Sequence, residues 1–221
     1  MNLSQFVKQY RDEQLIDSAT FALLSRNVQG LRCDVQYWRK QGHLIPLKRG
    51  IYVLSEDLRK QPLSMGFIAN NLLSPSYVSL EYALSYYDLI PEMVTVYTSV
   101  TTQKTTTFKT PIGIFEYHSV QEGLFKGFTK ASEAGRDYFI ATPEKAILDF
   151  FYFHQGLKGK TGEFESYRLQ NLEIINLKRF DEFRKLYNKK VNSIARSFLD
   201  FIRMERKNYK KSKWEITLNQ S

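Results

Sequence analysis

The stretch LRCDVQYWRKQGHLIPLKRGIYVL, residues 31–54, begins with the pattern of an amphipathic helix. Leu31, Val35 and Trp38 are spaced at i, i+4 and i+7, so all three lie on one side of a helix. The pattern predicts a helix from Leu31 to Gln41 that buries this apolar stripe. The charged and polar side chains between the three positions are then directed away from the core.

A hairpin is predicted immediately after this helix. Gly42 is expected to end the helix, because glycine adopts the left-handed conformation without strain. The runs HLIPL and IYVL are short and β-prone, and KRG joins them with Gly50 available for a tight reversal. We therefore expect a two-stranded hairpin with Lys48 and Arg49 at its tip.

Two further helices are predicted before this stretch. The first has apolar residues at helical spacing: Leu3, Phe6, Val7 and Tyr10. The second begins after Asp17 and Ser18, which are good capping residues, and we expect Asn27 to end it in the left-handed conformation. A helix, a turn, a basic helix and a hairpin in this order are typical of a winged helix-turn-helix.

Positive charge concentrates on the basic helix and the hairpin. Between Arg26 and Gly50, six arginines and lysines stand against one acid, Asp34. Such a cluster is the expected footprint of phosphate binding, although a solvated surface can carry one too. Arginine and glutamine can read base edges in the major groove, so we assign this role to Arg32 and Gln36. The other candidate DNA contacts, chiefly to phosphates, are Arg26, Tyr37, Arg39, Lys40, Lys48 and Arg49.

The remainder of the chain predicts an α+β fold. The polar segment SEDLRKQP suggests a boundary at residues 55–62, giving a DNA-binding domain over residues 1–58 and a mixed domain over residues 59–210. The runs MVTVYTSVT, TTFKT, IGIFEYHSV and DYFIAT are β-prone, whereas LSMGFIANNLL and SLEYALSYYDLI look helical. TPEKAILDFFYFHQG predicts a helix capped by Thr142, with Pro143 at its first position.

The C-terminal part is predicted to be helical and basic. Residues 156–221 hold sixteen lysines and arginines against eight acids, whereas residues 61–155 are mildly acidic. This face suits a second contact to nucleic acid or protein, or simply a solvated surface. Residues 211–221 are expected to form a frayed tail. The apolar anchors of the helices are predicted to be Phe183, Leu186, Ile194, Phe198, Phe201 and Ile202.

No catalytic constellation is evident. GLKGKTGE lacks the spacing and the preceding strand of a phosphate-binding loop, so we expect a flexible turn. Three dispersed histidines supply no base for a nucleophile. Scattered acids could in principle hold a metal ion: Glu81, Asp88, Glu116, Glu144 and Asp149. We expect no enzymatic activity, no cofactor and no metal, with a degenerate nuclease as the alternative.

The composition of the chain indicates the cellular compartment in which the protein is expected. One cysteine excludes an internal disulfide, no apolar run approaches the roughly 20 residues of a membrane span, and the first residues lack the apolar core of a secretory signal. We therefore expect a cytoplasmic protein without membrane contact.

Four blocks of sequence in this order resemble the AbiE-type antitoxin family of bacterial type IV toxin–antitoxin systems. They are LKRGIYVL, PSYVSLEYALSYYDLIPE, VYTSVTTQKTTTFKTPIGIFEYHSV and ATPEKAILDFFY, and the resemblance covers about residues 15–155. It implies a winged helix that binds inverted repeats in the protein's own promoter. It also implies an antitoxin domain that neutralises a nucleotidyltransferase-like toxin without catalysis and without a stable complex.

The resemblance supports Lys48 and Arg49 in the wing, because LKRGIYVL corresponds to Leu47–Leu54. The expected partners are thus double-stranded DNA and a toxin. A stand-alone winged-helix regulator without a toxin is a further alternative, for which only the DNA-binding half of the function would hold.

Overall fold

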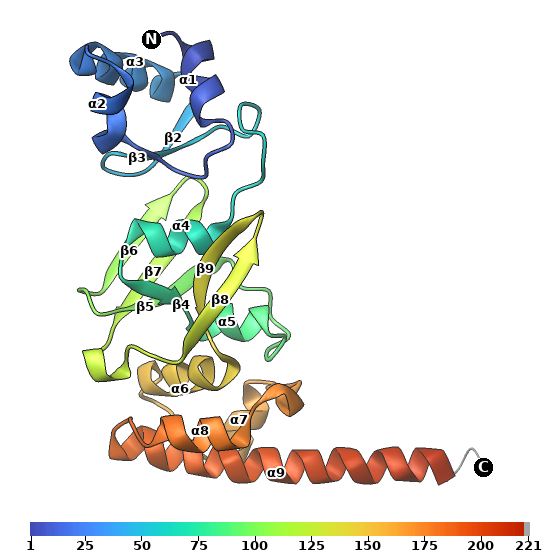
Figure 1. Cartoon of the computed structure of the whole chain (residues 1–221). Coiled ribbons are helices and arrows are strands. Elements are labelled where there is room, and N and C mark those ends of the chain that lie inside the picture. Colours follow the sequence, from blue (N-terminus) through green and yellow to red (C-terminus); the bar gives the residue numbers. More distant parts are fainter. Residues whose placement is uncertain (219–221) are drawn as a thin grey trace. The chain divides into compact units, whose positions relative to one another are not determined.

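The computed structural model describes the backbone of residues 1–218 and the side chains of residues 1–207. Its fold is mixed α+β, with 45% helix and 21% strand, as the sequence predicts. The chain divides into two compact units. Unit 1 comprises Met1–Tyr77, Thr95–Ser119 and Lys130–Phe139, and unit 2 comprises Val78–Val94, Val120–Thr129 and Ile140–Ser221. Figure 1 shows the elements in chain order.

Unit 1 begins with short helices and a small sheet. The helical elements are α1 (Leu3–Tyr10), the 3-10 helix η1 (Ser18–Thr20), α2 (Phe21–Leu24) and α3 (Val28–Lys40). The strands are β1 (Ile16–Asp17), β2 (Leu44–Lys48) and β3 (Ile51–Leu54), and they pair antiparallel in the order β1-β3-β2. The predicted hairpin is therefore present, and a third strand extends it.

The two predicted glycine turns are confirmed. Gly42 follows α3 and Gly50 joins β2 to β3, and both have φ +81°, a value that residues with a Cβ rarely adopt. A Cβ on Gly50 would also approach the Ser18 hydroxyl to 2.8 Å. These glycines fix where α3 stops and where the hairpin reverses.

The role predicted for Asn27 is wrong. Helix α2 ends at Leu24, and Asn27 has φ −94° rather than a left-handed conformation. Its side chain accepts a hydrogen bond of 2.8 Å from the Gly30 amide, so Asn27 is the N-cap of α3. As a result α3 begins at Val28, before the predicted start at Leu31.

Aromatic side chains hold the helices and the small sheet together. The ring of Phe6 lies 4.9 Å from Trp38 and 6.1 Å from Phe21, measured between centroids. The core around them is completed by further buried residues of α1, α3 and the strands: Tyr10, Ile16, Leu31, Val35, Leu44, Tyr52 and Leu54. The predicted apolar stripe of α3 is thus buried.

A six-stranded mixed sheet follows, with the order β6-β7-β5-β4-β9-β8. Its strands are β4 (Ser76–Val78), β5 (Val96–Thr101), β6 (Thr106–Thr110), β7 (Gly113–Ser119), β8 (Phe128–Glu133) and β9 (Arg136–Ala141). Strand β7 pairs with β5 in parallel and with β6 antiparallel. The strands predicted from β-prone runs are present, whereas β4 and β8 are additional. Helix α4 (Met65–Leu72) packs closely against strand β9. A Cβ on Gly66 of the helix would lie only 2.4 Å from the ring of Tyr138 in that strand.

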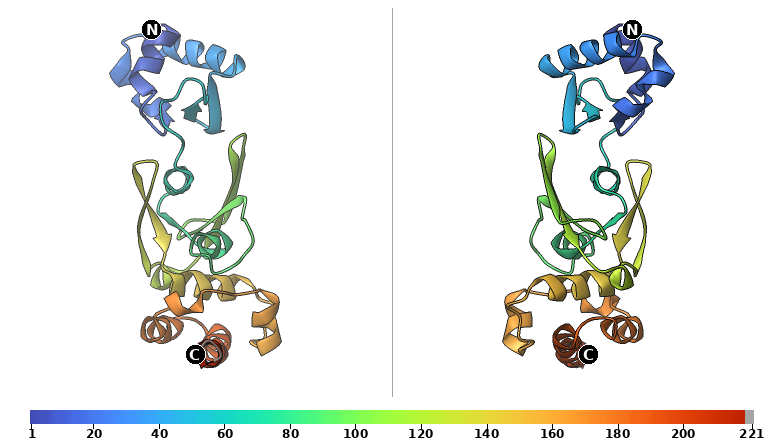
Figure 2. Two further views of the ribbon diagram at one scale, coloured as in Figure 1. Left: turned by 90° about the vertical axis from the view of Figure 1, so that its right-hand side faces the viewer. Right: turned by 90° about the vertical axis from the view of Figure 1, so that its left-hand side faces the viewer.

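Unit 2 is mainly helical. Its helices are α5 (Leu80–Tyr86), α6 (Pro143–Phe153), α7 (Thr161–Ser166), α8 (Leu177–Arg184) and α9 (Lys189–Leu218), with short 3-10 turns at Glu122–Leu124 and Leu172–Ile174. Helices α8 and α9 lie side by side against α6 (Figures 1 and 2). Helix α6 is buried from Glu144 to Phe151, so polar as well as apolar side chains lie inside.

Two details of unit 2 differ from the prediction. Leu186, a predicted apolar anchor, is 43% exposed because it lies in the turn between α8 and α9. Part of the predicted turn GLKGKTGE begins helix α7, whose start is held by the Glu163 carboxylate accepting from the amides of Lys158 and Lys160. Helix α9 extends to Leu218, so residues 211–218 have a helical backbone; the frayed tail predicted for residues 211–221 stays a prediction, and residues 219–221 lie outside the described residues.

The compact units do not follow the boundary predicted at residues 55–62, which lies within unit 1. Long-range hydrogen bonds cross that position. The buried side chain of Gln14 donates to the Pro62 carbonyl at 2.9 Å and accepts from the Ser64 amide at 2.7 Å. Arg136 also contacts the Asp12 carbonyl at 3.0 Å. The first 58 residues are thereby joined to later segments of unit 1.

Candidate nucleic-acid interface

Helix α3 presents one apolar side and one polar side. Leu31, Val35 and Trp38 are each at most 5% exposed, and they fix how the helix is rotated about its axis. The side chains between them therefore project into solvent. All six residues predicted to contact DNA in and beside α3 are exposed: Arg26, Arg32, Gln36, Tyr37, Arg39 and Lys40.

The positive groups of this surface are unpaired. Within residues 1–207, no ion pair and no side-chain hydrogen bond engages the cationic groups of Arg26, Arg32, Arg39, Lys40 or Arg49. Asp34, the acid of the cluster, lies 4.0 Å from the amino group of Met1 instead. Positive charge without an internal partner is available for a phosphate.

Arg32, Gln36 and Arg39 follow one another at i, i+4 and i+7, so they form one exposed stripe along α3. Tyr37 is 61% exposed beside it. Cys33, the single cysteine of the chain, is exposed on the same outer side. The stripe combines guanidinium and carboxamide groups, which are the donors and acceptors suited to base edges and phosphates.

The earlier start of α3 adds one residue that the sequence reasoning missed. Gln29 lies in the first turn, is exposed, and is spaced from Cys33, Gln36 and Lys40 by four, seven and eleven residues. It therefore belongs to the exposed side of the helix. The signal that could have identified it is Asn27, which suits an N-cap as well as a helix end.

The two residues at the hairpin tip differ. Arg49 is exposed, and its contact to DNA stays a prediction. Lys48 is half-buried: its ammonium donates a hydrogen bond of 2.6 Å to the Leu72 carbonyl and lies 5.9 Å from the centre of the Phe108 ring. A DNA contact by Lys48 stays a prediction and would require this internal bond to open.

A second concentration of polar groups lies inside unit 2. The Asp149 carboxylate accepts from the Ser79 hydroxyl at 2.8 Å, from the Lys145 ammonium at 2.5 Å and from the Tyr187 hydroxyl at 2.7 Å. Burial lowers the pKa of Lys145, and the neighbouring Asp149 carboxylate opposes this shift. All four side chains are buried, so they meet one another rather than solvent. This arrangement joins α5, α6 and the turn after α8.

The other acids considered as metal ligands are dispersed. Among the described residues, no three His, Cys, Asp or Glu side chains are grouped as metal ligands would be. Glu144, for example, accepts from the Asn176 amide at 2.8 Å and lies 3.6 Å from the Arg179 guanidinium. Glu144, which is 1% exposed, is therefore held by partners that are distant in sequence. No helix in the described part of the chain is both long enough and apolar enough to span a membrane.

Comparison of the chain with protein-family models and with curated proteins finds no match.

Proposed function

We propose that the N-terminal part of the protein is a winged helix-turn-helix that binds a specific site in double-stranded DNA. The observation that carries this proposal is the buried stripe Leu31, Val35 and Trp38, which directs the polar side of α3 into solvent. In this proposal α3 is the recognition helix and the β2–β3 hairpin is the wing.

The exposed residues divide into two roles. Arg32 and Gln36 contact base edges, because arginine can bond guanine and glutamine can bond adenine in two places each. Gln29 is added to this group from its position on the same side of α3. Arg26, Arg39, Lys40 and Arg49 contact phosphates, which position the protein without reading sequence.

We further propose that the protein represses its own promoter and acts as an antitoxin against a nucleotidyltransferase-like toxin. This part rests on the resemblance to the AbiE-type antitoxin family. The residues predicted to form the antitoxin domain, 59–210, would neutralise the toxin without catalysis. Co-expression with a nucleotidyltransferase encoded beside its gene tests this role: restored growth supports it, and unchanged toxicity contradicts it.

DNA binding can be tested by measuring the affinity of the full chain for its own upstream DNA and for a scrambled duplex. The upstream DNA should bind more tightly, and affinity should fall steeply with salt as counterions are released. Equal affinity for the two duplexes would remove the claim of a specific repressor. Metal-dependent cleavage of either duplex would instead favour a nuclease.

Variants separate the two proposed roles. Arg32→Ala or Gln36→Ala should reduce the preference for the upstream DNA by about 1–3 kcal/mol. Arg49→Ala should weaken binding to both duplexes alike and reduce the slope of log affinity against log salt by about 0.9. Lys104→Ala is the matched control, because Lys104 is an exposed lysine of unit 1 outside α3 and the hairpin.

A further inference from the structure

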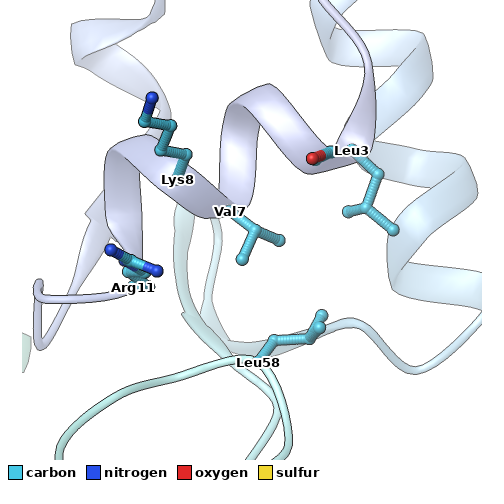
Figure 3. Close-up of a pocket in the computed structure, with 6 residues that line it drawn as sticks. Leu3, Val7, Lys8, Arg11 and Leu58 are labelled. Carbon is cyan, nitrogen blue, oxygen red and sulfur yellow. The ribbon is translucent and has the colours of Figure 1, made fainter.

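Helix α1 has a second apolar side that is covered only in part, because Leu3, Val7 and Leu58 pack against the core without being buried in it. Phe6 and Tyr10 point into the core, whereas Leu3 and Val7 are only partly buried. Together with Leu58 they line an open groove of about 490 Å³. Figure 3 shows Val7 and Leu58 facing one another, with Leu3 beside them.

The edge of this groove is positive. Its polar lining residues are Ser4, Lys8 and Arg11, and no carboxylate lines it. The nearest acid in sequence, Asp12, lies 3.3 Å from Lys60 and 3.8 Å from Arg11, so a lysine outside the groove engages it more closely. Lys8 has no ion pair among the described residues and is exposed.

The structure assigns this groove to an amphipathic helix of a partner protein, with apolar residues on one side and acidic residues beside them. Leu3 and Val7 are one turn apart and rise about 6 Å along α1. This spacing matches apolar anchors placed at i and i+3 or i+4 on a helix that lies in a groove. The acidic flanks follow from charge complementarity with Lys8 and Arg11.

A second copy of the chain fits this groove less well. Helix α1 contains no acidic residue, so a symmetric α1–α1 contact would bring Lys8 and Arg11 of both copies into one interface with no acid of α1 to offset their charge. Like charges at such a contact are unfavourable. An acidic partner helix avoids this repulsion.

The groove is linked to α3 by direct packing. Phe6, one residue before Val7, contacts Trp38 of the α3 stripe with ring centroids 4.9 Å apart. The groove is nevertheless formed by α1 and the segment after β3, and it uses none of the residues proposed to contact DNA. The inference is therefore independent of the proposed DNA binding.

The test measures binding of a labelled helical peptide of about 14 residues to the full chain by fluorescence anisotropy. The peptide carries leucine at i, i+3, i+4 and i+7, with glutamate at the flanking positions. A sibling carries lysine in place of glutamate, and another carries alanine in place of leucine. We expect the acidic leucine peptide to bind and both siblings to bind at least about tenfold more weakly.

The protein variant Lys8→Glu/Arg11→Glu should weaken binding of the acidic peptide by about tenfold or more. Its matched control is Lys104→Glu/Lys109→Glu, which makes the same change of charge at exposed lysines of unit 1 outside the groove. Circular dichroism should be unchanged in both variants, because all four side chains are exposed.

Four results would overturn the inference. The first is that the acidic peptide does not bind at concentrations up to about 1 mM. The second is that the alanine sibling binds equally well, and the third is that the control variant loses as much affinity as Lys8→Glu/Arg11→Glu. The fourth is that the chain forms a dimer in sedimentation and that this dimer excludes the peptide. The last result would assign the groove to a second copy.

Discussion

The buried carboxylate of Asp149 accepts hydrogen bonds from Ser79, Lys145 and Tyr187. Asp149→Asn removes the counter-ion of Lys145, whose side chain is 3% exposed. We expect this change to lower the free energy of unfolding by about 3–5 kcal/mol, because it leaves a buried charge without its partner. Urea unfolding followed by circular dichroism measures the loss.

The double variant Lys145→Met/Asp149→Leu removes both charges, so it tests whether an unpaired buried charge causes the loss of stability. It should be less destabilised than the sum of its two single variants, because neither buried charge is then left alone. Additive losses would show that the pair does not act as a unit.

Tyr87 gives a pH dependence with a definite sign. Burial, together with the nearby charges of Tyr86 and Glu144, raises the pKa of Tyr87 to about 12 from an ordinary value of 10. Between pH 10 and pH 12 the unfolded chain therefore loses this proton first, and the free energy of unfolding falls. With about 1.4 kcal/mol per pKa unit, reduced for partial exposure, the tyrosine contributes about 1–2 kcal/mol of this fall.

Tyr87→Phe should be about 1 kcal/mol less stable than the wild type near pH 9, since the hydrogen bond from the Tyr87 hydroxyl to the Ala141 carbonyl is lost. Its stability should then fall less steeply up to pH 12. An exposed tyrosine that does not influence the pKa of Tyr87 supplies the control, Tyr37→Phe, which should keep the wild-type slope. Parallel slopes for wild type and Tyr87→Phe would contradict the assignment.

Among the elements, the N-terminus of helix α3 depends on two residues, Asn27 and Gly30. Asn27 caps the Gly30 amide, and a Cβ on Gly30 would approach the Asn27 side chain to 2.5 Å. Gly30→Ala should therefore displace the cap, which offsets the gain of about 1 kcal/mol in helix propensity. We expect Gly30→Ala alone to change stability little.

The same substitution in an Asn27→Ala background should stabilise the protein by about 1 kcal/mol, because no cap is left to displace. Thermal or urea unfolding of the wild type and the three variants gives the coupling. An equal effect of Gly30→Ala in both backgrounds would show that the cap does not depend on the glycine.

Local sequence patterns predicted most of the elements but not all of their bounds. The spacing of Leu31, Val35 and Trp38 and the position of Gly42 were sufficient for the body and the end of α3. Its beginning was predicted wrongly because asparagine suits both a helix end and an N-cap, and only the Gly30 amide decides between them. Because the predicted start of α3 was too late, Gln29 was not recognised as a residue of this helix.

Contacts between distant residues were beyond those patterns. Helix α6 reads as amphipathic, yet Glu144, Lys145 and Asp149 are buried, because their partners lie far away in sequence. The half-burial of Lys48 depends likewise on the Leu72 carbonyl, twenty-four residues later. A charged residue in a predicted hairpin tip can be exposed or bound internally, and its neighbours in sequence do not distinguish these outcomes.

Across the whole molecule, Gln14 shows how unit 1 joins separate stretches of chain. Gln14→Leu would leave the Ser64 amide without its acceptor, so we expect a loss of about 1–3 kcal/mol in the free energy of unfolding of the full chain. Gln9→Leu is the control: this residue is exposed on α1, and its change should stay within about 0.5 kcal/mol. Similar effects of the two substitutions would indicate that the Gln14 bonds contribute nothing.

Cys33 gives the molecule a chemical label in a useful place. It is the single thiol of the chain and is exposed on the outer side of α3, so an alkylating reagent modifies one known position. If α3 enters the major groove, bound DNA covers this thiol, and alkylation should slow in proportion to the fraction of protein bound. The rate of one covalent reaction then reports the orientation of α3 on DNA without any substitution in the protein.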